Sequence, residues 1–439
     1  MKARLLTIWE RLHTSFWFVP GLVIAGAFVL SIFTLRADEQ MNQAAVNRLP
    51  FVFHDGVEGA RGLLSTVAGS MITVTGVTFS VVIVAFTLAS SQFTPRLLRN
   101  FMRDVGNQVV LAIFIATFTY CLCILRVVGG PAGDFIPRVS VTCGFALAAI
   151  SIGALVYFIH HASLLIQAPT IVATIARELD NALEPLCTAG AATAAAGGAE
   201  LPADYVEQSA EVHAAQSDYI EAIDTQGLFA LAEANEITIA VERRPGDFIG
   251  VGEVIAHAFP AARVSSHLCR TICGAFLFGP ERTQTQDPEF VLNELVEIAV
   301  RALSPGINDP ATAVLCVDRL GAALIKVAAL PITSARRYSP GGELRLVAKH
   351  YGFRGLADAA FNQIRQYSRD SVPVTMRLLE ALQRIAPHVQ RDEDLETLLR
   401  HAAMIERGSR REAFDEVDRA GIEERYHAVL AALRRTGSV

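Results

Sequence analysis

The feature that most constrains this chain is an uncharged run from Gly62 to Pro95. A helix needs about 20 apolar residues to cross a bilayer core of roughly 30 Å, so this run is long enough for a transmembrane helix. Three more uncharged, apolar runs lie in the first 165 residues. We therefore predict four transmembrane spans, at residues 14–35, 64–92, 105–125 and 139–160.

Hydroxyl side chains recur along the second span. Seven residues make two helical turns with about 20° of drift, so side chains at this spacing form one slowly winding stripe. The stripe consists of Thr66, Ser70, Thr73, Ser80, Thr87 and Ser91. Hydroxyls of this kind can line a water-filled path, or they can pack helices together in lipid. Their spacing alone does not choose between a pore-lining stripe and a packing seam.

A basic segment follows Pro95. Arg96, Arg99 and Arg103 share one face of a predicted short amphipathic helix at the membrane surface. In an oligomer these arginines would concentrate anions at the cytoplasmic mouth of a pore. They would equally serve as an ordinary positive-inside anchor. The lysine and arginine bias of the short loops predicts that both termini are cytoplasmic and that residues 36–61 lie outside.

The remainder of the chain has the composition of a soluble protein. We predict a transmembrane domain at 1–161, a juxtamembrane helix and linker at 162–204, an α/β domain at 205–335 and a helical C-terminal region at 336–439. The predicted fold class is thus an α-helical membrane domain with four transmembrane helices, followed by a cytoplasmic mixed α/β domain with a helical C-terminal part.

A polar cluster between two predicted helices invites an enzymatic interpretation. It comprises Ser304, Pro305, Gly306, Asn308, Asp309 and Pro310. A nucleophilic serine needs a base beside it, and the nearest histidines in sequence are His267 and His350. A turn that ends in an N-cap explains every residue of the cluster. Asp309–Pro310 repeats the cap-and-proline device that Asp287–Pro288 provides for the preceding helix.

Three motifs together carry a resemblance: SSQFTPRLLRNF, FGPERTQTQDPEF and RALSPGINDPATA. With them, the chain resembles bacterial predicted membrane proteins grouped as domain of unknown function 2254, over roughly Phe16 to Val374. The resemblance implies an integral membrane protein with a cytoplasmic C-terminal part. It implies no activity.

The absence of charged residues from the predicted spans argues against some classes of function. None contains Asp, Glu, Lys or Arg, which argues against ion-coupled transporters and proton pumps. We expect no catalytic residues, no metal and no cofactor, because no nucleotide or zinc-hydrolase motif occurs and the seven cysteines are scattered. The net charge of −6 argues against nucleic acid. The expected partners are membrane lipid, further copies of the chain in a homo-oligomer, and small ions.

Two functions are favoured, and an enzyme ranks third. The preferred one is an oligomeric, channel-like pore of the bacterial inner membrane, gated by its cytoplasmic domain and anion-preferring if the arginines form its mouth. The alternative is a membrane-anchored sensor or scaffold whose cytoplasmic domain binds a ligand or a partner protein.

Overall fold

The computed structural model describes residues 18–40, 53–92, 105–130, 135–165, 167–193, 201–202, 204–329, 336–349 and 351–436. The chain divides into two compact units, Met1–Thr170 and Ile171–Val439. The first holds the apolar helices, and the second holds two small sheets and a helical part.

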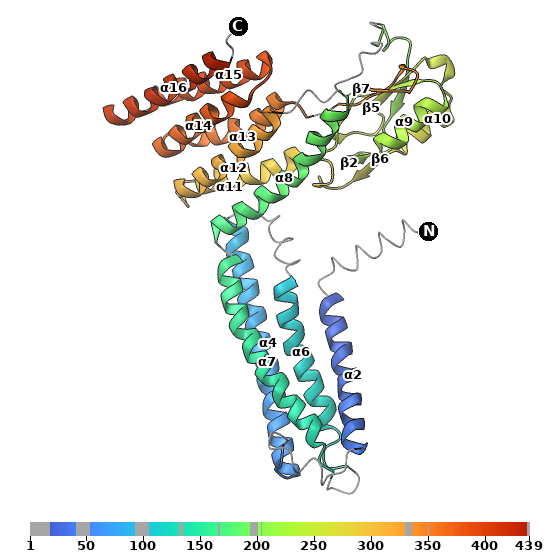
Figure 1. Cartoon of the computed structure of the whole chain (residues 1–439), viewed down its shortest axis with the longest axis vertical. Helices are drawn as coiled ribbons and strands as arrows, with labels where there is room; N and C mark the ends of the chain where they lie inside the picture. Colours follow the sequence, from blue (N-terminus) through green and yellow to red (C-terminus); the bar gives the residue numbers. More distant parts are fainter. Residues whose placement is uncertain are drawn as a thin grey trace. The chain divides into compact units, whose positions relative to one another are not determined.

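The four helices of the first unit run side by side (Figure 1). They are α2 (Phe18–Gln40), α4 (Val57–Gln92), α6 (Val105–Leu125) and α7 (Arg138–Leu165). All four contain a segment long and apolar enough to cross a membrane, which confirms the predicted membrane domain. The third predicted span coincides with α6. Helix α4 begins at Val57, seven residues before the predicted span. These extra residues include charged side chains, which need not enter lipid.

Helix α6 lies at the centre of this unit. It packs against α2, α4 and α7. In its most apolar 18-residue segment 56% of the residues are buried, against 22% in the corresponding segment of each of the other three helices. Phe114, Tyr120 and Ile124 of α6 are completely buried. Side chains of α6 therefore fill the middle of the four-helix unit.

Polar contacts between helices fix the register of this bundle. The Tyr120 hydroxyl donates to the carbonyl oxygen of Ser140 (3.0 Å) and lies 2.9 Å from the Thr34 hydroxyl. The Asp38 carboxylate, near the end of α2, accepts from the backbone N–H groups of Val139 (2.8 Å) and Ser140 (2.9 Å). Asp38 therefore caps the first turn of α7 from another helix, satisfying donors that a helix start leaves unpaired.

Helix α8 (Ala168–Thr193) begins three residues before the second unit, which continues into strands and short helices. The strands are β1 (Ala210–His213), β2 (Asp218–Ile223), β3 (Thr238–Val241), β4 (Phe248–Ile249), β5 (Val254–Phe259), β6 (Phe276–Gly279), β7 (Arg336–Tyr338) and β8 (Leu344–Val347). The helices among them are α9 (Thr225–Ala234), η1 (Ala261–Arg263) and α10 (Ser266–Cys273).

These strands form two sheets. One has the order β1-β5-β3-β8-β7, and the other has the order β4-β2-β6. Pairing is antiparallel except between β3 and β8, which are parallel. Ile220, Ile239 and Ile255 are completely buried in the core shared by both sheets. Strand β3 is the middle strand of the larger sheet, and three of its four residues, Ile239, Ala240 and Val241, are buried.

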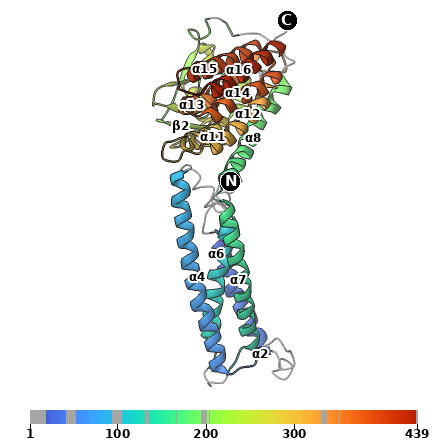
Figure 2. The ribbon, with the colours of Figure 1, turned by 90° about the vertical axis from the view of Figure 1, so that its left-hand side faces the viewer.

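The helical part stacks in layers (Figure 2). It comprises α11 (Pro288–Ala302), α12 (Pro310–Ala328), α13 (Phe353–Tyr367), α14 (Val372–Ile385), η2 (Ala386–His388), α15 (Asp392–Ser409) and α16 (Glu416–Thr436). Helices α11 and α12 pack against α13 and α14, so they lie with the C-terminal helices rather than with the sheets. Between them and α13 the chain returns to the larger sheet as β7 and β8. The predicted α/β region and helical C-terminal region are therefore both present, but they interleave along the chain.

Candidate functional site

The hydroxyl stripe of α4 lies on the side of the helix that its neighbours leave uncovered. The stripe residues with described side chains are all exposed: Thr66, Ser70, Thr73, Ser80 and Thr87. The buried residues of α4 lie on its other side: Ala60, Leu64, Ala68, Met71, Thr78 and Val82. The stripe is therefore not the seam that holds α4 to the rest of its own unit.

Four stripe hydroxyls donate to a backbone carbonyl one turn earlier in α4. The oxygen–oxygen distances are 2.7 Å for Thr66 to Gly62, 2.7 Å for Ser70 to Thr66, 2.9 Å for Thr73 to Gly69 and 3.0 Å for Thr87 to Ile83. Each proton is satisfied within the helix, so these side chains tolerate a lipid surface. Their oxygen lone pairs still point outward and can accept from water.

Apolar side chains of α4 beside the stripe are also exposed within the single chain. Ile72 is 50% exposed and Phe79 is 47% exposed. Each lies one residue before a stripe member, a rotation of about 100° on a helix. The uncovered sector of α4 is therefore wide, and on the face of the stripe itself it also includes Val77 (60% exposed) and Val84 (55% exposed). The Ser91 side chain and the arginines at 96, 99 and 103 lie outside the described residues.

The polar cluster of the second unit lies between α11 and α12. The Ser304 hydroxyl donates to the Arg301 carbonyl oxygen (2.7 Å), so it is bound to backbone rather than to a base. The Asp309 carboxylate accepts from the Thr312 N–H (3.1 Å) and from the Thr312 hydroxyl (2.6 Å). Asn308 has a φ of 51°, a left-handed conformation that asparagine tolerates. Pro305 and Gly306 are exposed in this turn.

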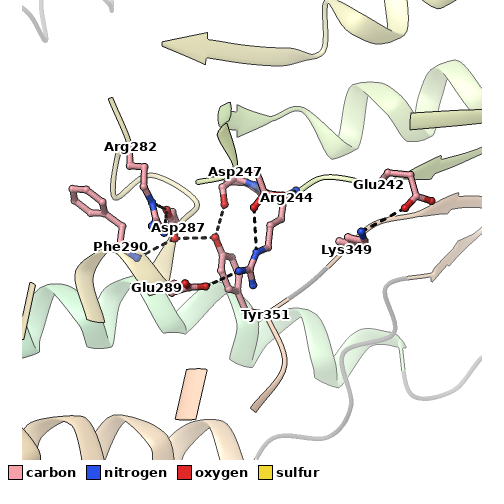
Figure 3. Close-up of polar contacts among 10 residues, drawn as sticks. Glu242, Arg244, Asp247, Arg282, Asp287, Glu289, Phe290, Lys349 and Tyr351 are labelled. Carbon is pink, nitrogen blue, oxygen red and sulfur yellow. Dashed lines mark hydrogen bonds and ion pairs between the residues drawn. The ribbon is translucent and has the colours of Figure 1, made fainter. Parts of the chain in front are cut away.

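A second polar cluster surrounds Asp287, which caps α11 (Figure 3). The Asp287 side chain is 1% exposed, and each of its oxygens is engaged. One oxygen accepts from the Phe290 N–H (3.0 Å) and from the Tyr351 hydroxyl (2.8 Å). The other accepts from Nε of Arg282 (2.7 Å). A buried carboxylate is stable only when it is paired and hydrogen-bonded, and Asp287 meets both conditions.

Tyr351 joins this cluster to the turn before β4. Its hydroxyl lies 2.6 Å from the Pro245 carbonyl oxygen, and the Arg244 guanidinium lies over its ring at 4.6 Å. Arg244 in turn binds Glu289 at 2.8 Å. Burial, followed by the charge of Asp287, raises the pKa of the Tyr351 phenol, so it stays protonated as a donor. The cluster thus joins three segments and leaves the Asp287 carboxylate no free position for a substrate.

The sequence contains only part of the signal for this cluster. Asp287 is recognisable as a cap, and Arg282 lies five residues before it in FGPERTQTQDPEF. Tyr351 is 64 positions from Asp287, and no local pattern relates the two. Among the described residues, no group of three or more potential metal-ligating side chains is close enough to hold an ion.

A model of a family described as "Predicted membrane protein (DUF2254)" matches residues 13–384. The chain belongs to the DUF2254 family. This confirms the resemblance drawn from the three motifs. Similar proteins include an uncharacterised protein of Mycobacterium bovis and one of Mycobacterium tuberculosis, each 33% identical over 451 residues, covering 100% of this chain and 84% of the relative. No solved structure matches this DUF2254 chain.

Proposed function

We propose that this DUF2254 protein is an oligomeric, channel-like pore of the bacterial inner membrane, gated by its soluble unit. The observation that carries the proposal is the outward position of the α4 hydroxyls. Thr66, Ser70 and Thr73 are exposed on the first unit. Had they been buried among the unit's own helices, they could not line a path between copies.

A path through the middle of one protomer is not compatible with the packing of α6. Its completely buried side chains, Phe114, Tyr120 and Ile124, occupy that position. A water-filled route must therefore run between copies of the chain, with α4 facing the symmetry axis. The stripe oxygens would then accept from water along the route, as hydroxyl-lined pores require.

Anion preference is the finer part of the proposal. It rests on Arg96, Arg99 and Arg103, which follow α4 in the sequence and would stand at its cytoplasmic end. A ring of guanidinium groups attracts anions and repels cations at an entrance. Substituting Arg99→Glu should therefore shift the ion preference of liposome flux towards cations.

Cysteine accessibility tests the pore directly. In a background without native cysteines, single cysteines at Thr73, Ser80 and Thr87 should react with small charged thiol reagents. Cysteines at Ile72, Phe79 and Phe86 are the matched controls, and lipid or a neighbouring copy should protect them. Equal protection of all six, together with no ion flux in liposomes, would exclude the pore.

The same cysteine-free background tests the orientation of the chain in the membrane. A thiol introduced by Asp134→Cys should be labelled from outside, and one introduced by Ala168→Cys only from inside. Labelling of both variants from the same side would contradict the predicted topology.

A sensor or scaffold is the second candidate, and a cleft in the α/β part favours it. The cleft measures about 520 Å³, within the range of small-molecule sites. Its charged lining comes from Glu236, Arg263, Glu343 and Arg345. Arg263 is bound to Glu236 at 2.9 Å, and Arg345 is bound to Glu343. A polar ligand would have to exchange with these ion pairs, which are weak where they are exposed.

A further inference from the structure

A small recess lies in the helical part, where the end of α13, the start of α14 and the end of α15 meet. Its cavity is about 10 Å³, which is room for one water molecule or one oxygen atom of a larger group. The polar residues that line it are Arg365, Ser368, Arg369, Thr375 and Ser409. We refer to these residues, with the neighbouring Arg407, as the arginine recess.

The three arginines of the recess differ from the other arginines of α14 and α15. Elsewhere, Arg384 binds Asp318 at 2.6 Å and Arg400 binds Asp358 at 2.6 Å. By contrast, Arg365, Arg369 and Arg407 form no hydrogen bond or ion pair with any residue that the structure describes. Arg365 and Arg369 are also four residues apart, a spacing at which like charges destabilise a helix.

Burial makes this arrangement more costly. The Nε atom of Arg365 is covered by protein and lacks an acceptor, and the hydroxyl of Ser371 at the start of α14 is likewise buried without a partner among the described residues. Burial lowers the pKa of the Arg365 guanidinium, and the charges of Arg369 and Arg407 lower it further. No carboxylate is among the groups that shift this pKa. The three positive charges therefore repel one another, and the part of the chain that the structure describes supplies no counter-ion.

Helix dipoles explain only part of this placement. The C-terminal ends of α13 and α15 favour nearby cations. That attraction is worth less than a hydrogen-bonded ion pair and supplies no acceptor for Nε of Arg365. The start of α14, which meets the recess, instead favours an anion, because its first N–H groups are unpaired in the helix.

We propose that the arginine recess binds a phosphate-type oxyanion. One oxygen would occupy the cavity beside Arg365 and Ser368, and the others would meet the exposed side chains of Arg369 and Arg407. Guanidinium groups are well matched to phosphate because their N–H donors pair with two oxygens at once. The same chemistry describes inorganic phosphate and the phosphate of a lipid headgroup. This inference does not depend on the pore.

Melting of the full-length protein in detergent tests the site. A ligand that binds only the folded state raises the Tm in a concentration-dependent manner. Sodium phosphate, compared with sodium chloride at equal ionic strength, should raise the Tm of the wild-type protein and of Arg354→Gln, an exposed control on α13. For Arg369→Gln and Arg407→Gln the phosphate affinity should fall at least about tenfold, as expected for a lost charged hydrogen bond. Short-chain phosphatidic acid, compared with phosphatidylcholine, is the second probe.

The outcomes distinguish a free anion from a lipid headgroup, and either ligand from the absence of a site. A shift with inorganic phosphate that the two recess variants lose supports the site with a free anion as ligand. The same pattern with phosphatidic acid alone supports it with a lipid headgroup as ligand. A chloride-only buffer adds a test that needs no ligand: Arg369→Gln should melt at or above the wild-type temperature, because it relieves repulsion. Equal shifts in all variants, no shift with either probe, or a lower Tm for Arg369→Gln in chloride would overturn the proposal.

Discussion

Two aspartates, each followed by a proline, begin neighbouring helices in the second unit, and their surroundings differ sharply. Asp287 caps α11 from a buried position, where Arg282 and Tyr351 bind it. Asp309 caps α12 from a partly exposed turn, where its carboxylate binds Thr312 and no other of the described residues. Both caps have the same Asp–Pro pair and nearly the same backbone angles, with φ of −122° and −115° and ψ of 84° and 81°. The tertiary environment differs. Asp287 connects separate segments of the chain through its hydrogen bonds, whereas Asp309 serves only as a helix cap.

The largest expected effect is that of Asp287→Ala. It removes a buried carboxylate and leaves Arg282 without its partner, a change that typically costs about 3–5 kcal/mol of the free energy of unfolding. Calorimetric melting of the full-length protein in detergent, with hydrogen exchange over residues 282–303, would measure it. Asp287→Asn is the matched control. It keeps acceptors for Phe290 and Tyr351 and should cost less. A loss near 1 kcal/mol for the alanine variant, which is about the value of a cap alone, would show that the cluster adds nothing to the cap.

Tyr351→Phe should have an intermediate effect. It removes the hydroxyl that donates to the buried Asp287 carboxylate and that also lies 2.6 Å from the Pro245 carbonyl oxygen. Losing a buried hydrogen bond of this kind costs about 1–3 kcal/mol. Tyr205→Phe is the control, because the Tyr205 hydroxyl binds a partly exposed carboxylate, Glu242, at 3.2 Å. That change should stay within about 0.5 kcal/mol. Equal melting temperatures for the two variants would contradict the proposal that the Tyr351–Asp287 hydrogen bond stabilises the fold.

These aspartates also show how far sequence reasoning reaches. Caps and uncharged spans are local patterns, and each predicted its element. Contacts over long separations were not predictable. Tyr351 reaches Asp287 across 64 positions, and β8 pairs with β3 only after α10, α11 and α12 have intervened. The α4 stripe is an intermediate case. Its spacing can be recognised in the sequence, but the direction in which it faces depends on packing against α6. No local sequence pattern reveals that α6 is the central helix.

The smallest expected effect is that of Asp309→Ala, and it carries the most information about function. Loss of an N-cap costs about 1 kcal/mol, because the Thr312 N–H loses its acceptor. Asp309→Asn or Asp309→Ser, which retain a capping oxygen, should recover most of that loss. The protein should still assemble and melt slightly earlier, and any ion flux should persist. If Asp309→Ala abolishes flux while the melting temperature is unchanged, the turn from Ser304 to Pro310 is a functional site, and its exposed residues become the first candidates for contact with a partner.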